Sequence, residues 1–306
     1  MDPAHLRLLR ELRDRGSVTA VAAALGISAS AVSQQLSTLQ SSVALPLTTR
    51  RGRVLTLTAA GEVLAAASTR VDEALTAARD AVGALLDAGD RPVRLSSFTS
   101  AGLALFGPLV RELGGAPSVH LADEDVAHRD FPGLTADYDL VIAHRLAHDS
   151  PWPVDRVVSS ALIDEPLDIA LHAEHPLAGR AQIDLDDLVD EDWVSVHQGF
   201  PLAGVLDHLG ARAGRPLRIA HRINEFSVTA EVVRAGAAIA IMPRTTASSL
   251  AVDGLVLRPL AGIELVRHLD VLARPDALAY ASVRRVLRAL QIVAARVRQD
   301  SLGSPL

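Results

Sequence analysis

Two short helical segments separated by one glycine restrict the fold of this chain more than any other feature of the sequence. A helix is predicted over residues 20–25, and Gly26 permits the left-handed backbone turn that ends it. Ser28 is a good N-cap for the next helix. Ala22 is small enough for the two helices to approach, and Val32 fills the angle between them. The pattern predicts a helix-turn-helix.

The second of these helices has an apolar side and a polar side. Val32, Leu36 and Leu39 recur at helical spacing and face inward. The opposite side carries short or amide side chains, which can approach base edges and phosphate groups. The residues expected to contact DNA are Ser28, Ala29, Ser30, Ser33, Gln34 and Ser37. The alternative is that these N-terminal helices are only a structural unit of an enzyme.

Two short extended runs follow around Gly52 and predict a β-hairpin wing. Arg50, Arg51 and Arg53 lie at its tip, where positive charge suits phosphates or a narrow minor groove. Residues 1–65 hold seven arginines and four acidic residues, although the whole chain has a net charge of −6. A basic segment on an acidic body is typical of a DNA reader joined to another domain. The alternative for each arginine is a solvated surface charge.

Four motifs occur in order, at residues 16–28, 31–36, 47–50 and 57–61. Together they resemble the N-terminal signature of LysR-type transcriptional regulators, over about the first 65 residues. The resemblance implies a winged helix-turn-helix that binds a specific DNA sequence. This chain has Ala29, Gln40 and Thr48 where that family usually has Gln, Glu and Phe. Because Ala29 removes a polar side chain from the predicted reading face, the operator sequence cannot be transferred from relatives.

Residues 61–86 are rich in alanine and free of proline, which predicts one long helix. Its apolar residues recur at heptad spacing, at Leu64, Val71, Leu75, Ala78, Val82 and Leu85. A helix packed on its own domain is one explanation. The family resemblance favours the other, a homodimer or homotetramer joined through antiparallel linker helices. Such an assembly implies double-stranded DNA with paired half-sites as the operator.

Beyond residues 90–92 the sequence alternates strand-like and helix-like segments, which predicts an α/β architecture with mainly parallel sheets. Strands are expected at 93–98, 119–122, 139–143, 157–163, 167–171, 193–196, 218–223, 238–242, 256–259 and 268–273. Helices are expected at 101–113, 202–213, 226–235 and 277–298. Since aromatic residues make up only 3% of the chain, Ala, Leu and Val must fill the core.

The C-terminal part resembles the effector domain of the same family at residues 94–108, 139–143, 172–178 and 233–243. The resemblance implies the two-lobed fold of periplasmic-binding proteins of type II, with crossings between the lobes near 164–167 and 266–270. The predicted domains are a winged helix-turn-helix over 1–60, a linker and dimerisation helix over 61–90, and an effector-binding domain over 91–306. Lobe I comprises about 91–164 and 267–300, and lobe II comprises about 165–266.

Ligands of such sheets bind in the crevice at the carboxyl ends of the strands, near helix N-termini with free N–H groups. The side chains expected there are Thr99, Ser100, His144, His197, Gln198, Phe200, Asn224, Phe226 and Ser227. Helix capping is the alternative role for the hydroxyl residues, and packing is the alternative for the two phenylalanines. Helix N-termini with hydroxyl groups favour a carboxylate-bearing small-molecule effector.

Other classes of protein find less support. The chain has no cysteine and lacks the nucleophile elbow, the phosphate-binding loop and the dinucleotide fingerprint, so we expect no enzyme, cofactor or metal. His144 with His148, and His172 with His175, have metal-ligand spacing, but loop histidines are more often solvated.

No apolar run approaches the ~20 residues that span a bilayer, so we expect no membrane contact and a cytoplasmic location. RNA polymerase is a further expected partner. The alternatives are a solute-binding module without effective DNA binding and an amidohydrolase-like enzyme.

Overall fold

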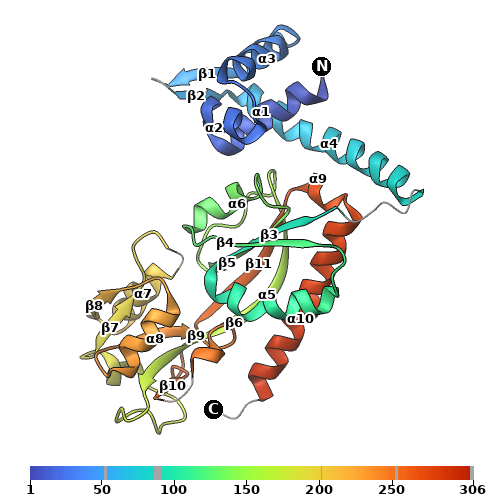
Figure 1. Ribbon diagram of the computed structural model, residues 1–306. Coiled ribbons are helices and arrows are strands. Elements are labelled where there is room, and N and C mark those ends of the chain that lie inside the picture. Colours follow the sequence, from blue (N-terminus) through green and yellow to red (C-terminus); the bar gives the residue numbers. More distant parts are fainter. Residues whose placement is uncertain (52–53, 86–90, 201, 252–253, 304–306) are drawn as a thin grey trace.

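In the computed structural model the chain forms a small N-terminal domain, one long helix and a larger body with two lobes (Figure 1). The structure describes residues 1–51, 54–85, 91–200, 202–251 and 254–303. The N-terminal domain and the long helix lie at one end of the first lobe, and the second lobe lies at the other (Figure 1).

The N-terminal domain is built from helices and a two-stranded hairpin. Its elements are α1 (Pro3–Arg15), α2 (Val18–Leu25), α3 (Ala29–Ser41), β1 (Thr48–Arg51) and β2 (Val54–Leu57). The N-cap side chains of Asp2, Ser17 and Ser28 each accept a backbone N–H group. Gly16 and Gly26 follow α1 and α2 with φ of 73° and 65°, the left-handed conformation that ends a helix. The predicted helix-turn-helix is confirmed, and α2 begins earlier than expected because Ser17 caps it.

Gln40 and Gly61 fix the hairpin against the helices. The Gln40 side chain donates to the carbonyl groups of Val43 and Leu45 and accepts the N–H of Leu47 at 2.7 Å. A Cβ on Gly61 would lie 2.0 Å from the Leu47 carbonyl oxygen, so the backbone approach there requires glycine. Both contacts hold the segment between α3 and the wing in place.

The long helix α4 (Ala59–Leu85) joins the N-terminal domain to the body. It packs along α1 and also contacts α9 (Pro275–Leu278). Leu64 packs against the N-terminal core, whereas Val71 and Leu75 are exposed at 36% and 39%. One end of the predicted heptad seam therefore packs on its own domain, and apolar side chains remain exposed further along it.

The body contains one long sheet with strand order β4-β3-β5-β11-β6-β9-β7-β8, and β10 pairs with β6. The strands are β3 (Val93–Ser97), β4 (Val119–Asp123), β5 (Leu140–Leu146), β6 (Val158–His172), β7 (Asp192–Ser195), β8 (Arg218–Arg222), β9 (Ile239–Pro243), β10 (Leu255–Arg258) and β11 (Val266–Ala273). In the first lobe β3 lies parallel to β4 and β5, and in the second β7 lies parallel to β8 and β9. The connecting strands β6 and β11 are antiparallel to each other and to their other neighbours, so the expectation of mainly parallel sheets is wrong there.

A single strand runs through both lobes where the sequence predicted two, at 157–163 and 167–171. β6 pairs with β11 up to Pro166 and with β9 from Leu167 onward. Pro166 has no N–H to donate, but its carbonyl accepts the N–H of Arg244 at 2.9 Å, and the next N–H, of Leu167, finds a carbonyl at 2.9 Å. The ladder therefore continues past the proline.

Helices pack on the sheet and at its ends. They are α5 (Thr99–Leu113), α6 (Phe131–Leu134), α7 (Ala203–Arg212), α8 (Phe226–Arg234), α9, α10 (Ala281–Gly303) and the short 3-10 turns η1 (His128–Asp130), η2 (Leu185–Leu188) and η3 (Ser248–Leu250). The helix predicted over 277–298 is divided into α9 and α10, and the Arg284 side chain donates to the carbonyl groups of Leu278 and Ala279 where α9 ends. Each lobe has its own apolar core. None of the described helices is both long and apolar enough to cross a membrane.

Candidate DNA-reading face and ligand cleft

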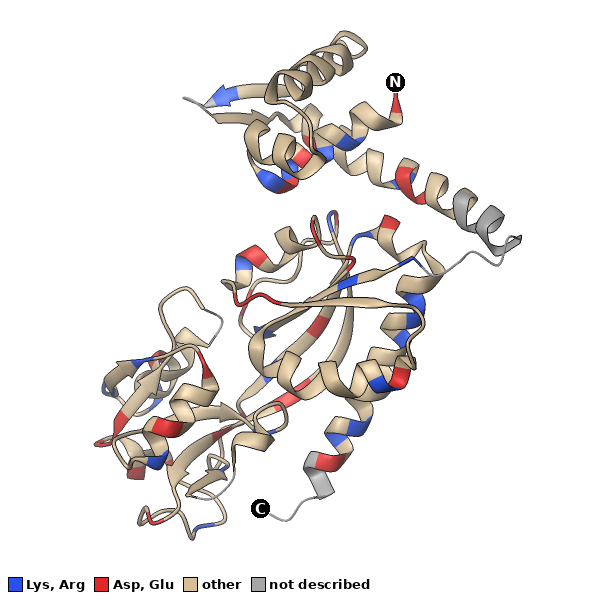
Figure 2. Cartoon of the chain, in the orientation of Figure 1, with Lys and Arg blue, Asp and Glu red and all other residues tan. Residues whose placement is uncertain are grey.

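The outward face of α3 presents the predicted reading residues. These residues, Ser28, Ala29, Ser30, Ser33, Gln34 and Ser37, are all exposed. Some hydroxyl groups serve the helix itself, since Ser28 caps α3 and Ser33 donates to the Ala29 carbonyl at 2.9 Å. Gln34 is the longest polar side chain of the set. Because α3 carries no charged residue (Figure 2), this face offers hydrogen bonds but no charged side chain.

The wing supplies positive charge beside that face. Arg50 lies in β1, opposite Leu55 of β2, and is exposed. Arg51 follows it in the same strand. Gly52 and Arg53, which the sequence places at the tip, lie outside the described residues. The described part of the wing therefore offers Arg50 as an exposed cation.

A small cavity opens between the two lobes, at the carboxyl ends of β3 and β7. Its lining comprises Phe98, Thr99, Ser100, Asp125, His144, Val196, Phe200, Leu202, Asn224, Glu225, Phe226 and Arg267. The space in which the centre of a water-sized group fits is about 30 Å³, and the empty region around it, including its opening to solvent, is about 400 Å³. Of the predicted effector residues, the structure brings together Thr99, Ser100, His144, Phe200, Asn224 and Phe226 at this cavity.

Three predicted effector residues do not line the cavity. His197 and Gln198 follow β7 but are exposed, and the His197 N–H donates to the Asn224 side chain at 2.8 Å. Ser227 donates its hydroxyl to Glu225, the N-cap of α8, at 3.2 Å. The His197 N–H thus supports the loop after β7, and Ser227 supports the N-terminal cap of α8. Helix capping was the alternative role considered for Ser227.

Sequence reasoning missed Phe98, Asp125, Val196, Leu202, Glu225 and Arg267 in this lining. The most consequential is Arg267 of β11, which pairs with Glu165 of β6 at 2.6 Å; the two side chains are 1% and 0% exposed. Arg267 also donates to the hydroxyl groups of Ser100 at 3.0 Å and Thr246 at 2.5 Å. The sequence did hold a signal for this pair, because Glu165 and Arg267 each lie in a segment predicted to cross between the lobes. The buried pair ties α5 to both connecting strands.

His144 of β5 is buried among aromatic rings at the cavity. Its ring centroid lies 4.3 Å from that of Phe98 and 5.7 Å from that of Phe131. Burial, and then the nearby Arg267, hold the pKa of His144 well below its ordinary value, so the ring is neutral. Its Nδ1 atom is buried and has no hydrogen-bond partner among the described residues.

The histidines with metal-ligand spacing have other contacts. His172 and His175 each accept a backbone N–H through Nδ1, from Glu174 and Leu177. Among the described residues, no group of three or more His, Asp or Glu side chains is arranged to hold a metal ion.

Two acidic side chains reach the cavity from opposite lobes. Asp125 follows β4, and Glu225 caps α8. Although Asp125 is exposed, partial desolvation of its carboxyl and then the Glu225 carboxylate raise the pKa of Asp125 to about 6, against the opposing effect of Arg267. The cavity therefore carries negative charge on both sides.

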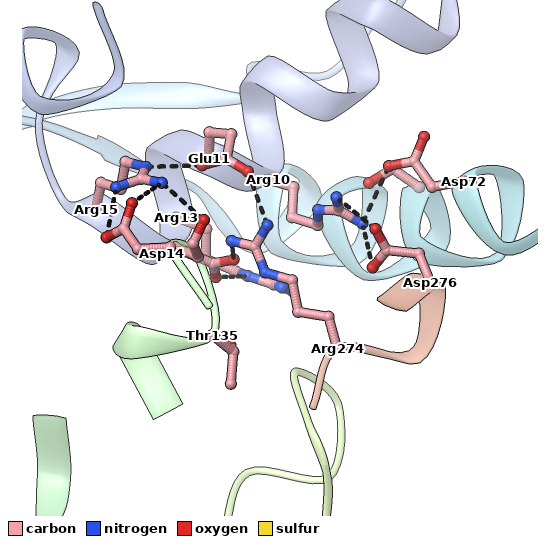
Figure 3. Close-up of polar contacts among 12 residues, drawn as sticks. Arg10, Glu11, Arg13, Asp14, Arg15, Asp72, Thr135, Arg274 and Asp276 are labelled. Atoms are coloured by element: carbon pink, nitrogen blue, oxygen red, sulfur yellow. Dashed lines mark hydrogen bonds and ion pairs between the residues drawn. The ribbon is translucent and has the colours of Figure 1, made fainter. Parts of the chain in front are cut away.

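A network of ion pairs joins the N-terminal domain to the first lobe of the same chain (Figure 3). Arg10 of α1 is 2% exposed and pairs with Asp72 of α4 at 3.0 Å and with Asp276 of α9 at 3.3 Å. Arg15 of α1 pairs with Asp137 of the first lobe at 3.0 Å. Some of the arginines in the basic N-terminal segment are thus used within the chain rather than offered to DNA.

Arg274, directly after β11, is central to this network. It donates to Glu11 at 2.8 Å and to Asp14 at 2.7 Å, and the three side chains are 9%, 3% and 6% exposed. Arg156 adds a further pair to Asp14 at 3.1 Å. Burial raises the pKa of Glu11 and Asp14, but Arg274 and the neighbouring arginines outweigh it, so both pKa values lie below the ordinary range. We refer to Arg10, Glu11, Asp14, Arg15, Asp72, Asp137, Arg156, Arg274 and Asp276 as the α1 network.

A winged helix-turn-helix joined by a long helix to a two-lobed α/β domain with a cavity between the lobes defines a ligand-responsive, DNA-binding transcriptional regulator. The family model for the LysR substrate binding domain matches residues 87–295, and the model for the bacterial regulatory helix-turn-helix protein of the lysR family matches residues 3–62. The chain therefore belongs to the LysR family of transcriptional regulators, and its relatives are regulators rather than enzymes.

Curated relatives and solved structures agree with this assignment. The small neutral protease regulatory protein of Streptomyces coelicolor is 30% identical over 286 residues, which cover 89% of this chain and 86% of the relative. The regulator CbbR of Rhodospirillum rubrum is 26% identical over 283 residues, which cover 89% of this chain and 91% of CbbR. A full-length OxyR variant from Pseudomonas aeruginosa superposes with a TM-score of 0.67 at 19% identity, covering 96% and 94%. CbnR, a LysR family regulator, superposes with a TM-score of 0.53 at 19% identity, and the match covers 95% of this chain and 100% of CbnR. At these identities the structural likeness shows the fold.

Proposed function

We propose that α3 enters the major groove of double-stranded DNA, while the wing arginines Arg50, Arg51 and Arg53 contact the flanking phosphates. The observation that carries this proposal is the separation of groups on the two elements: the exposed face of α3 is polar but uncharged, and positive charge lies on the wing. Hydrogen bonds to base edges give sequence selectivity, whereas arginines at phosphates mainly give affinity.

Footprinting on the DNA upstream of the protein's own gene tests this assignment. The wild-type protein should protect paired half-sites, and the protection should weaken at higher salt. Gln34→Ala should relax the preference at one base by about 1–3 kcal/mol, whereas Arg50→Ala should weaken binding to all sequences alike. Arg129→Ala, which removes an 88% exposed arginine of the body, is the control. No protection at either salt would favour a solute-binding module without DNA binding.

We also propose a homodimer or homotetramer in which α4 contacts another copy. Val63, Val71 and Leu75 of α4 are exposed at 71%, 36% and 39%, and such apolar side chains favour burial in an assembly. Val82 and Leu85 continue the predicted seam, but their side chains are not among those that the structure describes. Sedimentation of Leu75→Glu tests the proposal, because a charge in the seam should shift the protein to monomer and abolish the protection of paired half-sites.

The domain boundaries remain our proposal: 1–60, 61–90 and 91–306, with lobe I at about 91–164 and 267–300 and lobe II at about 165–266. The effector is proposed to bind between the lobes. Thr99 and Ser100 begin α5, and the N-cap of this helix makes no side-chain hydrogen bond. The free N–H groups there support the predicted carboxylate on the ligand.

Ligand binding is proposed to change the angle between the lobes. Because the α1 network ties α1 to the first lobe, we expect that lobe and the DNA reader to move as one unit, with lobe II moving relative to both. In a dimer, such a movement changes the spacing of the two readers on DNA.

RNA polymerase as a partner and the cytoplasm as the location also stay predictions. Both follow from the class of protein, because a regulator acts where transcription begins. Transcription in vitro from a promoter that contains the protected half-sites, with purified RNA polymerase, tests the first.

A further inference from the structure

The cavity between the lobes has more negative than positive charge in its lining. Asp125 and Glu225 line it from opposite lobes, and Arg267 is the one arginine among its described lining residues. That arginine is already paired with Glu165 at 2.6 Å. A ligand that carries only negative charge would therefore meet two carboxylates and a cation that is already neutralised. A ligand with a positive group would find carboxylates on both sides.

His144 provides a second observation at the same place. Its side chain is 5% exposed and lines the cavity, and its Nδ1 atom has no hydrogen-bond partner among the described residues. Buried polar atoms in native proteins are almost always hydrogen-bonded, so such an atom at a cavity points to a group supplied by a ligand. Since the ring is neutral, it adds no positive charge that would attract an anion.

We propose that the effector of this chain is a small amine whose ammonium group lies between Asp125 and Glu225 and so bridges the two lobes. In naming the class of ligand, we build on the ligand-responsive function proposed above. An ammonium group has three N–H donors, enough for both carboxylates. It also removes the repulsion between two like charges on opposite lobes, which favours closure. Together with a carboxylate at the start of α5, this describes an amino acid.

Calorimetric titration of the full-length protein with matched compounds tests the proposal. Each set contains an amino acid, the amine left when its carboxylate is removed, and the acid left when its amine is removed; leucine, isopentylamine and isocaproate are one set. Sets with small, aliphatic and basic side chains are compared at pH 7.5. We expect members with the amine to bind, and to bind at least tenfold more weakly to Asp125→Asn and to Glu225→Gln. Asp123→Asn, which changes an exposed acid two residues away and outside the cavity, should bind as the wild type does.

Three outcomes overturn the proposal: binding by acids without an amine, amine binding that both variants retain, and no binding by any amine of the panel. Footprinting separates these results from a failure of the proposed function. If half-sites are still protected, the ligand class is wrong and the regulator stands. If they are not, the proposed DNA reading fails as well.

A second measurement needs no ligand. The pKa of Asp125 is raised to about 6, so ionising this carboxyl lowers the stability of the folded protein as the pH rises through about 6. Asp125→Asn should therefore raise the Tm of the free protein at pH 8 and raise it by less at pH 5, because the cost of the wild-type carboxyl grows as the pH rises from its unfolded pKa to its folded pKa. An unchanged Tm at pH 8 would contradict the charge excess on which the proposal depends.

Discussion

Arg274 holds the N-terminal domain on the first lobe, and its removal should loosen that contact. Arg274→Met keeps an unbranched side chain but removes the charge between Glu11 and Asp14. Because these carboxylates are 3% and 6% exposed, loss of their partner is expected to cost about 3–5 kcal/mol. Other arginines remain beside them, so we expect the lower end, about 3 kcal/mol, or roughly a hundredfold in the docking equilibrium.

Hydrogen exchange measures this loss locally. Amides of α1 should exchange about a hundredfold faster in Arg274→Met, while those of the second lobe stay unchanged. Arg129→Met, at an 88% exposed position, should change neither. Adding Glu11→Gln and Asp14→Asn to Arg274→Met removes the stranded charges and should recover most of the protection. Equal exchange in the single and triple variants, or a change below about 1 kcal/mol, would refute the reasoning.

The same variant shows whether the α1 network carries the ligand signal. With the contact loosened, the reader should still protect DNA, because α3 and the wing are unaltered. A bound ligand should no longer change the pattern of protection. A ligand response identical to that of the wild type would place the coupling elsewhere, in α4 alone.

Three further predictions follow from single features. Gly61→Ala should destabilise the N-terminal domain by about 1–3 kcal/mol in urea unfolding, because the added Cβ meets the Leu47 carbonyl oxygen at 2.0 Å. The pKa values of Glu11 and Asp14 are lowered by folding, so their contribution is complete above about pH 4 and is lost as the pH falls through the lowered values; α1 amides should lose protection over that acid range. Glu165→Gln leaves a fully buried arginine without its counter-charge and should cost about 3–5 kcal/mol in urea unfolding.

The N-terminal domain could be predicted from the sequence because each signal acts over a few residues. Gly26 ends a helix where it stands, and Ser28 caps the next within three residues. Part of the cleft could also be predicted, because some of its residues directly follow a strand. Thr99 and Asn224 were found in this way. Arg267 escaped notice because its partner Glu165 lies 102 residues away in the chain, and no local pattern reports such a pair.

The continuity of β6 was missed for a related reason. Pro166, with two acidic residues before it, has the local signature of a break between strands. The strand continues because partners from distant segments complete it: Arg244 bonds the proline carbonyl, and Arg267 neutralises Glu165. One long-range backbone hydrogen bond, from the N–H of Arg244, and one long-range ion pair therefore override a local signal in favour of a loop.

β11 links the two charge networks that local patterns could not reveal. Near its start Arg267 pairs with Glu165 beside the cavity, and directly after its end Arg274 pairs with Glu11 and Asp14 of α1. The seven residue steps between the two arginines correspond to about 23 Å of extended strand. β5 and β6 pair with this strand on its two sides, and its register with β6 shifts between Leu269 and Asp270. In the proposed mechanism, a ligand that draws lobe II toward the cavity therefore acts on the strand that is followed by Arg274, the residue that holds the DNA reader.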